Sequence, residues 1–181
     1  MSKLHVDQQS IKKILSENKS KYLIPEYQRP YEWDEDKCRT LWEDILEFAM
    51  PDNNPDNFNS NDEYFLGSIV TFKNENGDLE VIDGQQRITT LLLCLRAIYK
   101  KLEPAQDEQS KYLKSEIEPC LWQTEGIPPK PNKDIIRIET KVATDNDRDS
   151  FVKILKIGEA NGKDIYSKNF QLFQKWIDEY V

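Results

Sequence analysis

The stretch VIDGQQRITTLLL, residues 81–93, constrains the fold most, because it leads from a strand into a helix within a few residues. β-Branched residues precede Gly84, and apolar residues over 88–102 recur at the i, i+3, i+4, i+7 spacing of one helix face. Upstream, the pair Asn76-Gly77 is a strong signal for a tight hairpin turn. The sequence therefore predicts a hairpin whose second strand, residues 79–83, runs directly into a buried helix.

The rest of the chain predicts further helices around a small sheet. The first hairpin strand, residues 63–72, is expected to be largely buried. Expected helices cover residues 11–15, 34–49, 105–121, 145–157 and 167–181, with an extended segment over 21–33, a polar loop over 51–62, a proline-containing linker over 125–133 and a strand over 134–140. The last helix has an aromatic face that needs cover from this domain, from another copy of the chain, or from a continuation beyond residue 181.

Charge and residue counts exclude several kinds of site. The formal net charge of −8 argues against a broad non-specific grip on nucleic acid, which needs a basic surface, but leaves room for a small basic pocket. The three cysteines show no CxxC spacing, and His5 is the only histidine, which argues against a disulfide framework and a zinc site. No apolar run approaches the length of a membrane span, so we expect a soluble, cytoplasmic protein without membrane contact.

The polar residues between the strand and the helix have the chemistry of a phosphate or nucleotide site. Unpaired N–H groups and the positive dipole end of a helix N-terminus attract anions, and glycine lets a phosphate approach the backbone. Arginine supplies a forked cation, threonine and glutamine supply hydrogen bonds, and aspartate can hold Mg²⁺ or orient a water. The candidates are Asp83, Gly84, Gln85, Gln86, Arg87, Thr89 and Thr90. The site is not a P-loop, because G-x-x-x-x-G-K-[ST] is absent.

A purely structural interpretation of these residues stays open from the sequence alone. Asp83 could cap the helix, because aspartate is a preferred N-cap residue. Gly84 could then form only the turn, and Arg87 could pair with an acid on the surface. The binding-site and the structural interpretation both account for these residues.

Two further segments carry candidate ligand-binding residues. In YQRPYEW, residues 27–33, Gln28 and Arg29 stand between aromatic residues that could stack a base or line a pocket. In FLGSIV, residues 65–70, a glycine within a strand indicates close backbone approach, and Ser68 could contact a ligand. The alternatives are an aromatic core cluster with Arg29 in a salt bridge, and simple core packing of the second segment.

Three segments in the order IPEYQRPYEW, FLGSIV and VIDGQQRITTL resemble the N-terminal domain of the GmrSD-type restriction endonucleases, also called the DGQQR-domain family. The resemblance implies an α+β fold similar to ParB and sulfiredoxin, with a small mixed sheet and flanking helices, followed by a helical C-terminal portion. Residues 1–103 would form the nucleotide-binding core, and residues 104–181 a mainly helical extension with one strand. The cleaving HNH-type nuclease needs histidines, and none follows residue 5, so no nuclease domain is expected and the chain is expected to be a fragment or a regulatory subunit.

The resemblance also implies a function and assigns residues to it. The expected function is an NTP-binding and NTP-hydrolysing regulatory domain of a modification-dependent restriction system that defends against phage, with Mg²⁺ and a nucleoside triphosphate as cofactors. Expected catalytic residues are Asp83, which would also hold the metal, Gln85, Gln86 and Arg87. Expected nucleotide-binding residues are Gly84, Arg87, Thr89, Thr90, Gln28, Arg29, Tyr27 and Ser68.

Expected partners and alternative functions complete these predictions. The partners would be an HNH-type nuclease domain or subunit, DNA only together with that part, and a second copy of the chain. One alternative is a module that binds nucleotide or modified DNA without hydrolysis. The other is a structural interaction domain, in which the joint is only a capped helix.

Overall fold

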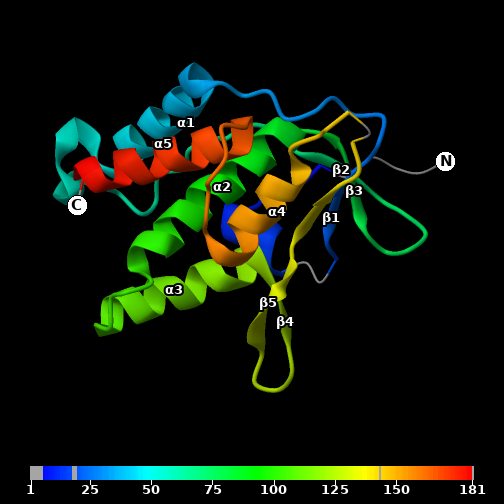
Figure 1. The fold of residues 1–181 in the computed structure, drawn as a ribbon. Coiled ribbons are helices and arrows are strands. Elements are labelled where there is room, and N and C mark those ends of the chain that lie inside the picture. The colour runs from blue at the N-terminus through cyan, green and yellow to red at the C-terminus, as the bar shows by residue number, and fades with distance from the viewer. Residues whose placement is uncertain (1–5, 18–19, 143, 181) are drawn as a thin grey trace.

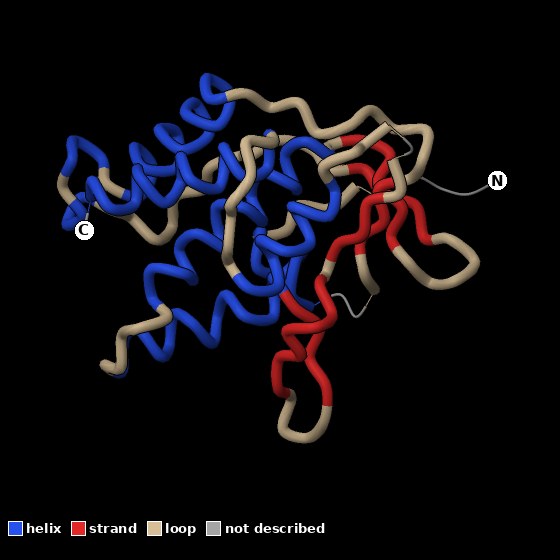
Figure 2. The backbone as a smooth tube through the Cα atoms, viewed as in Figure 1, coloured by secondary structure: helices blue, strands red, loops and turns tan. Residues whose placement is uncertain are grey.

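A small four-stranded sheet lies beside a group of helices in the computed structural model, which describes residues 6–17, 20–142 and 144–180 (Figure 1). The strand order is β2-β3-β1-β6, and a separate two-stranded hairpin, β4-β5, projects away from the body (Figure 2). The α+β fold class is therefore confirmed. His5 lies outside the described residues.

The hairpin that leads to the joint is formed by β2 (Val70–Lys73) and β3 (Leu79–Asp83), which pair antiparallel. Gly77 has a φ of 85° in the connecting turn, so the predicted turn is confirmed. The first strand is shorter than predicted and mostly exposed, because β2 is an edge strand and the chain before Val70 is irregular. Gly67, at a φ of 100°, lies in this irregular part and turns the chain toward α2.

The centre of the sheet is formed by β1 (Tyr22–Ile24), which runs parallel to both β3 and β6 (Ile138–Thr140). Tyr22 pairs in register with Ile138, and both are buried on the face that packs against the helices. Val81 of β3 is also fully buried. The sheet thus joins three segments that are far apart in the sequence.

The described residues also form five α-helices and short helical turns at Lys13–Glu17 (η1), Pro51–Asn53 (η2) and Pro55–Asn57 (η3). The helices are α1 (Glu35–Ala49), α2 (Gln85–Leu102), α3 (Glu108–Leu121), α4 (Arg148–Ile157) and α5 (Ile165–Tyr180). Asp34 caps α1 as predicted, because its carboxylate accepts a hydrogen bond from the Lys37 N–H at 3.2 Å. No helix among the described residues is long and apolar enough to cross a membrane.

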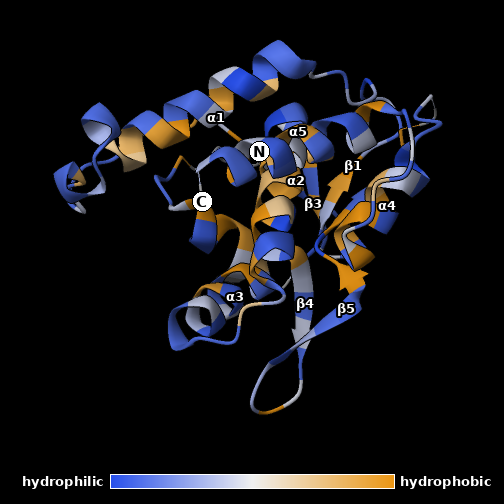
Figure 3. Ribbon diagram, turned by 60° about the vertical axis from the view of Figure 1, so that its left-hand side comes forward, coloured by the Kyte–Doolittle hydropathy of each residue, from blue (hydrophilic) through white to orange (hydrophobic). Residues whose placement is uncertain are grey.

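Helix α2 is the centre of the core, since it contacts α3, α4 and α5. Figure 3 shows hydrophobic residues gathered where α2, α4 and the strands meet. The aromatic face predicted for the last helix is covered within this chain: Phe170 and Phe173 are fully buried, and Trp176 stacks on Trp42 of α1 at 6.3 Å between ring centroids.

The proline-rich segment predicted to be a linker is part of a hairpin. Strand β4 (Trp122–Glu125) pairs antiparallel with β5 (Lys130–Ile136), so the predicted strand over residues 134–140 is divided between β5 and β6. Prolines are compatible with this hairpin because its turn and its edge positions need no backbone donor. The linker prediction was therefore wrong.

The predicted division at residue 103 stays a prediction, and the observed packing joins the two parts. Strand β6 pairs with β1, and one hydrophobic cluster extends from Leu15 to Ile177.

Candidate functional site

The junction of β3 and α2 presents a helix N-terminus without a side-chain cap among the described residues. Gly84 occupies the N-cap position with φ 90° and ψ 9°, and its carbonyl accepts the Ile88 N–H at 3.0 Å. The interpretation of Asp83 as the helix cap is therefore wrong. The first N–H groups of α2 keep their hydrogen-bonding capacity and the positive end of the helix dipole.

Arg87 is held over this N-terminus by the loop before β2. Its Nη1 donates to the Ser68 carbonyl at 2.9 Å, and it forms no ion pair with any described residue. The predicted alternative, a salt bridge to a surface acid, is thus not observed for the described part of the chain. The cation keeps its charge available for an anionic ligand.

Two glycines bring the loop this close. A Cβ on Gly67 would lie 2.6 Å from the Arg87 Cζ, so the guanidinium lies directly against the loop backbone. A Cβ on Gly84 would lie 2.9 Å from the Ser68 carbonyl oxygen. Only glycine fits at either position without a shift of neighbouring atoms, and both have a positive φ.

Other predicted residues of the joint differ in what they contact. Asp83 is exposed, so its carboxylate is accessible. Gln85 is 8% exposed and Thr89, one turn later, is 2% exposed, and neither side chain has a hydrogen-bond partner among the described residues. Arg96 Nη1 is the one buried side-chain atom without a partner in the part of the chain that the structure describes, so the polar atoms of Gln85 and Thr89 reach solvent and are open to a ligand.

Gln86 has a structural task. Its Nε2 donates to the Pro30 carbonyl at 2.9 Å, and its Oε1 accepts the Glu32 N–H at 2.8 Å. Both amide atoms therefore fasten segment 27–33 to α2. Gln28 fixes the start of the same segment, since its Nε2 donates to the Ile82 carbonyl at 3.0 Å. The structure thus brings the two predicted motifs together at the end of β3.

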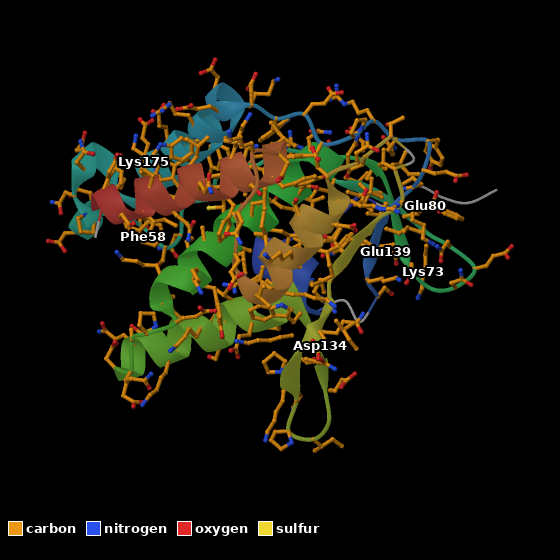
Figure 4. The ribbon with its side chains drawn as sticks, viewed as in Figure 1. Phe58, Lys73, Glu80, Asp134, Glu139 and Lys175 are labelled. Atoms are coloured by element: carbon orange, nitrogen blue, oxygen red, sulfur yellow. The ribbon has the colours of Figure 1, made fainter. Side chains whose placement is uncertain are left out.

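Arg29 and Tyr27 are both exposed residues of this segment. Arg29 pairs loosely with Glu32, at 3.6 Å between Nη1 and Oε2. The Tyr27 hydroxyl donates to Glu80 Oε1 at 2.9 Å. Glu80 lies at the sheet with Lys73 and Glu139, on the opposite side of the molecule from Phe58 and Lys175 (Figure 4). Arg29 can therefore move toward a ligand, whereas Tyr27 is tied to the sheet.

Tyr31 is a core residue, as the structural alternative predicted for the aromatic cluster. Its hydroxyl bonds to the Thr90 hydroxyl at 2.7 Å, and its ring stacks on Tyr166 at 5.0 Å between centroids. Asn169 of α5 donates to the Tyr31 hydroxyl at 3.0 Å and to the Trp33 carbonyl at 2.6 Å. Burial raises the pKa of Tyr31 well above its usual value, so the hydroxyl stays protonated. Thr90, predicted to bind nucleotide, serves this network.

Sequence reasoning missed two residues around the site. Asn169 gave no local signal, because it is separated from Tyr31 by 138 positions. Phe65 was assigned to a largely buried strand, but it is 79% exposed. Exposed Ser68 holds Arg87 through its main-chain carbonyl, which residue type alone does not predict.

An acidic hollow of about 340 Å³ lies on α1 beside the same loop and is a poor place for phosphate. Its lining includes three carboxylates, from Asp44, Glu47 and Asp62, which repel anions. Tyr64 also lines this hollow, and its hydroxyl donates to Asp44 at 2.6 Å. The Arg87 side of the loop is therefore the better candidate for binding an anion.

Comparison with known proteins gives a family. A family model described as "GmrSD restriction endonuclease, N-terminal domain" matches residues 11–181, which include all three segments of the site. No curated protein matches the chain.

Proposed function

The chain belongs to the family of GmrSD restriction endonuclease N-terminal domains, and from this premise we propose that it binds a nucleoside triphosphate at the N-terminus of α2 and hydrolyses it with Mg²⁺. Family membership connects the chain with restriction. The nucleotide is the further step. One observation carries it: Arg87 lies at an uncapped helix N-terminus and forms no ion pair with any described residue.

In this proposal the chain supplies both binding and charge neutralisation. The N–H groups of Gln85 and Gln86 bind phosphate oxygens, and Arg87 neutralises them with a forked donor. Arg29 approaches from segment 27–33 as a second cation. Gln85 and Thr89, which have no partner among the described residues, hydrogen bond to the nucleotide or to the attacking water.

The residues present fit Mg²⁺ bound together with phosphate. No group of three or more potential ligand side chains occurs in the part of the chain that the structure describes, but Mg²⁺ commonly takes one or two carboxylates plus substrate oxygens. Exposed Asp83 is the carboxylate at this junction. When bound, the ion would polarise the phosphoryl group.

A second candidate function, nucleotide binding without turnover, is favoured by Gln86. Both atoms of its amide are engaged by backbone groups, so Gln86 is not free to orient a water. Nucleotide binding would then shift the position of segment 27–33 and regulate a partner nuclease domain or subunit. Contact with DNA would require that partner.

The test is a thermal melt of the purified chain with each nucleoside triphosphate, with and without Mg²⁺. A ligand at about 100 times its Kd stabilises the folded state by about 2.7 kcal/mol, or roughly 5–10 °C for a chain of this size. We expect this shift to be lost in Arg87→Ala and kept in Arg148→Ala, which removes an exposed arginine at the start of α4.

Phosphate release then separates the two candidates. Release that depends on Asp83 supports the hydrolase, and binding without release supports the regulatory module. An equal shift in both arginine variants, or no shift with any triphosphate, would remove the nucleotide from this site.

A further inference from the structure

Phe65 is the most exposed phenylalanine among the described residues, with 79% of its surface accessible. Its aromatic neighbours are occupied: Tyr64 bonds to Asp44, and Phe58 packs against Phe48 at 5.8 Å between ring centroids. No ring contact involves Phe65 in the described part of the chain. A single exposed apolar side chain is common on protein surfaces, so the position of Phe65 beside the Arg87 loop carries the argument.

The position of Phe65 follows from the glycine two residues later. Gly67 lies against the Arg87 guanidinium: a Cβ added to this glycine would be 2.6 Å from the Arg87 Cζ. Two residues span at most about 7 Å of chain, so the Phe65 backbone lies within that distance of Gly67. A ring at this distance can reach a base whose phosphates lie on Arg87.

We propose that Phe65 is the platform on which the base of the bound nucleotide stacks, an inference that rests on the proposed function. A nucleotide carries a flat π-system and a polyanion joined by a sugar, and the loop presents an aromatic ring close to a cation. The same loop thereby binds both ends of one ligand. The Phe65 ring would bind the base, and the Ser68 carbonyl would hold Arg87 in place for the phosphates.

Tyr27, predicted from the sequence to bind nucleotide, is the weaker platform. Its hydroxyl is tied to Glu80, and a carboxylate at that position repels the phosphates of a nucleotide. Stacking on Phe65 tolerates any base, because every base has a π-face. The platform thus contributes affinity for nucleosides over simple phosphates.

The experiment compares two ligands by isothermal titration calorimetry: a nucleoside triphosphate and inorganic tripolyphosphate, which lacks base and sugar. In Phe65→Ala we expect affinity for the nucleoside triphosphate to fall about 5- to 100-fold, with tripolyphosphate affinity unchanged. Phe65→Trp should restore nucleotide affinity. Phe72→Ala, which truncates another exposed phenylalanine on β2, should behave as wild type.

The outcomes separate this inference from the proposed function. Unchanged nucleotide affinity in Phe65→Ala, or an equal loss for both ligands, overturns the stacking role while the phosphate site stands. If the wild-type chain binds neither ligand, the site and the platform are both wrong. Phe65 is exposed, so Phe65→Ala is expected to keep the wild-type melting temperature, which checks that the variant folds.

Discussion

At the scale of single residues, the site depends on two backbone positions that admit no side chain. Gly67 lies against the Arg87 guanidinium, Gly84 lies against Ser68 and Ile69 of the loop, and both glycines have a positive φ. These two close approaches allow the Arg87 guanidinium to lie against the loop backbone. The position of the Arg87 guanidinium therefore depends on having no Cβ at either glycine.

Replacing Gly67 tests this arrangement. Gly67→Ala places a methyl group 2.6 Å from the Arg87 Cζ, so the guanidinium must shift away from the loop backbone, which weakens its hydrogen bond to the Ser68 carbonyl. We expect stability to fall by about 1–3 kcal/mol, and nucleotide affinity to fall by roughly tenfold or more. Urea denaturation and calorimetry measure the two effects.

Gly77→Ala is the matched control. Gly77 also has a positive φ, of 85°, but its Cβ would meet only the flexible end of Lys73 at 3.9 Å. This variant should carry the backbone strain alone and bind nucleotide as wild type does. If both variants bind equally, Gly67 does not position Arg87.

The residue types at the joint could be predicted from the sequence, but their partners could not. Gly84 has the left-handed conformation, and Arg87 the unpaired charge, that the sequence of the strand-to-helix junction indicates. Gln86 and Thr90 have the right chemistry for a ligand, yet backbone and side-chain groups more than fifty positions away take their hydrogen bonds. Local pattern identifies a donor, and only the tertiary structure decides what it donates to.

At the scale of elements, α5 supports the site by holding segment 27–33. Asn169 joins this helix to segment 27–33 through the Tyr31 hydroxyl and the Trp33 carbonyl. Gln86 of α2 also holds this segment, since its amide donates to the Pro30 carbonyl. Arg29 thus sits on a segment held between two helices that pack on each other.

Removing the support from α5 should affect both stability and binding. Asn169→Ala leaves the Trp33 carbonyl and the Tyr31 hydroxyl each with one hydrogen bond fewer, which we expect to cost about 1–3 kcal/mol. Nucleotide affinity should fall as well, because the segment that bears Arg29 loosens. Gln171→Ala removes an exposed amide of the same helix and should change neither quantity by much. Wild-type binding by a destabilised Asn169→Ala would show that α5 supports the core alone.

Elements with strong periodicity were predictable, and those defined by pairing were not. The helices α2 and α5 have apolar faces that a 3.6-residue period reveals, and the structure confirms both. Strands β4 and β5 have mixed polar sequences without a clear period, and they are defined by their antiparallel pairing with each other. Residues 63–69 look like a strand by composition, but Gly67 turns them toward Arg87.

At the scale of the whole molecule, one core carries the site. Cys38 of α1 and Cys94 of α2 lie in the same hydrophobic cluster as Tyr31, so the walls of the site and the interior share their packing. Burial raises the pKa of both thiols, from 9.0 to about 11 for Cys38 and to about 12 for Cys94. The folded protein therefore holds neutral thiols under conditions in which an unfolded chain ionises.

This difference predicts a loss of stability at alkaline pH. The unfolded chain releases its thiol protons near pH 9, whereas folded Cys38 keeps its proton until about pH 11. Rising pH thus favours the unfolded state, so the free energy of unfolding should be at its full value below about pH 9 and fall up to about pH 11. The share of Cys38 is on the order of 2 kcal/mol. Urea denaturation at pH 7 to 11 measures it, and Cys38→Ala should show a shallower decline than wild type. Parallel pH profiles for the two proteins would mean that Cys38 is not protected by the core, and that segment 27–33 opens to solvent more readily than its hydrogen bonds imply.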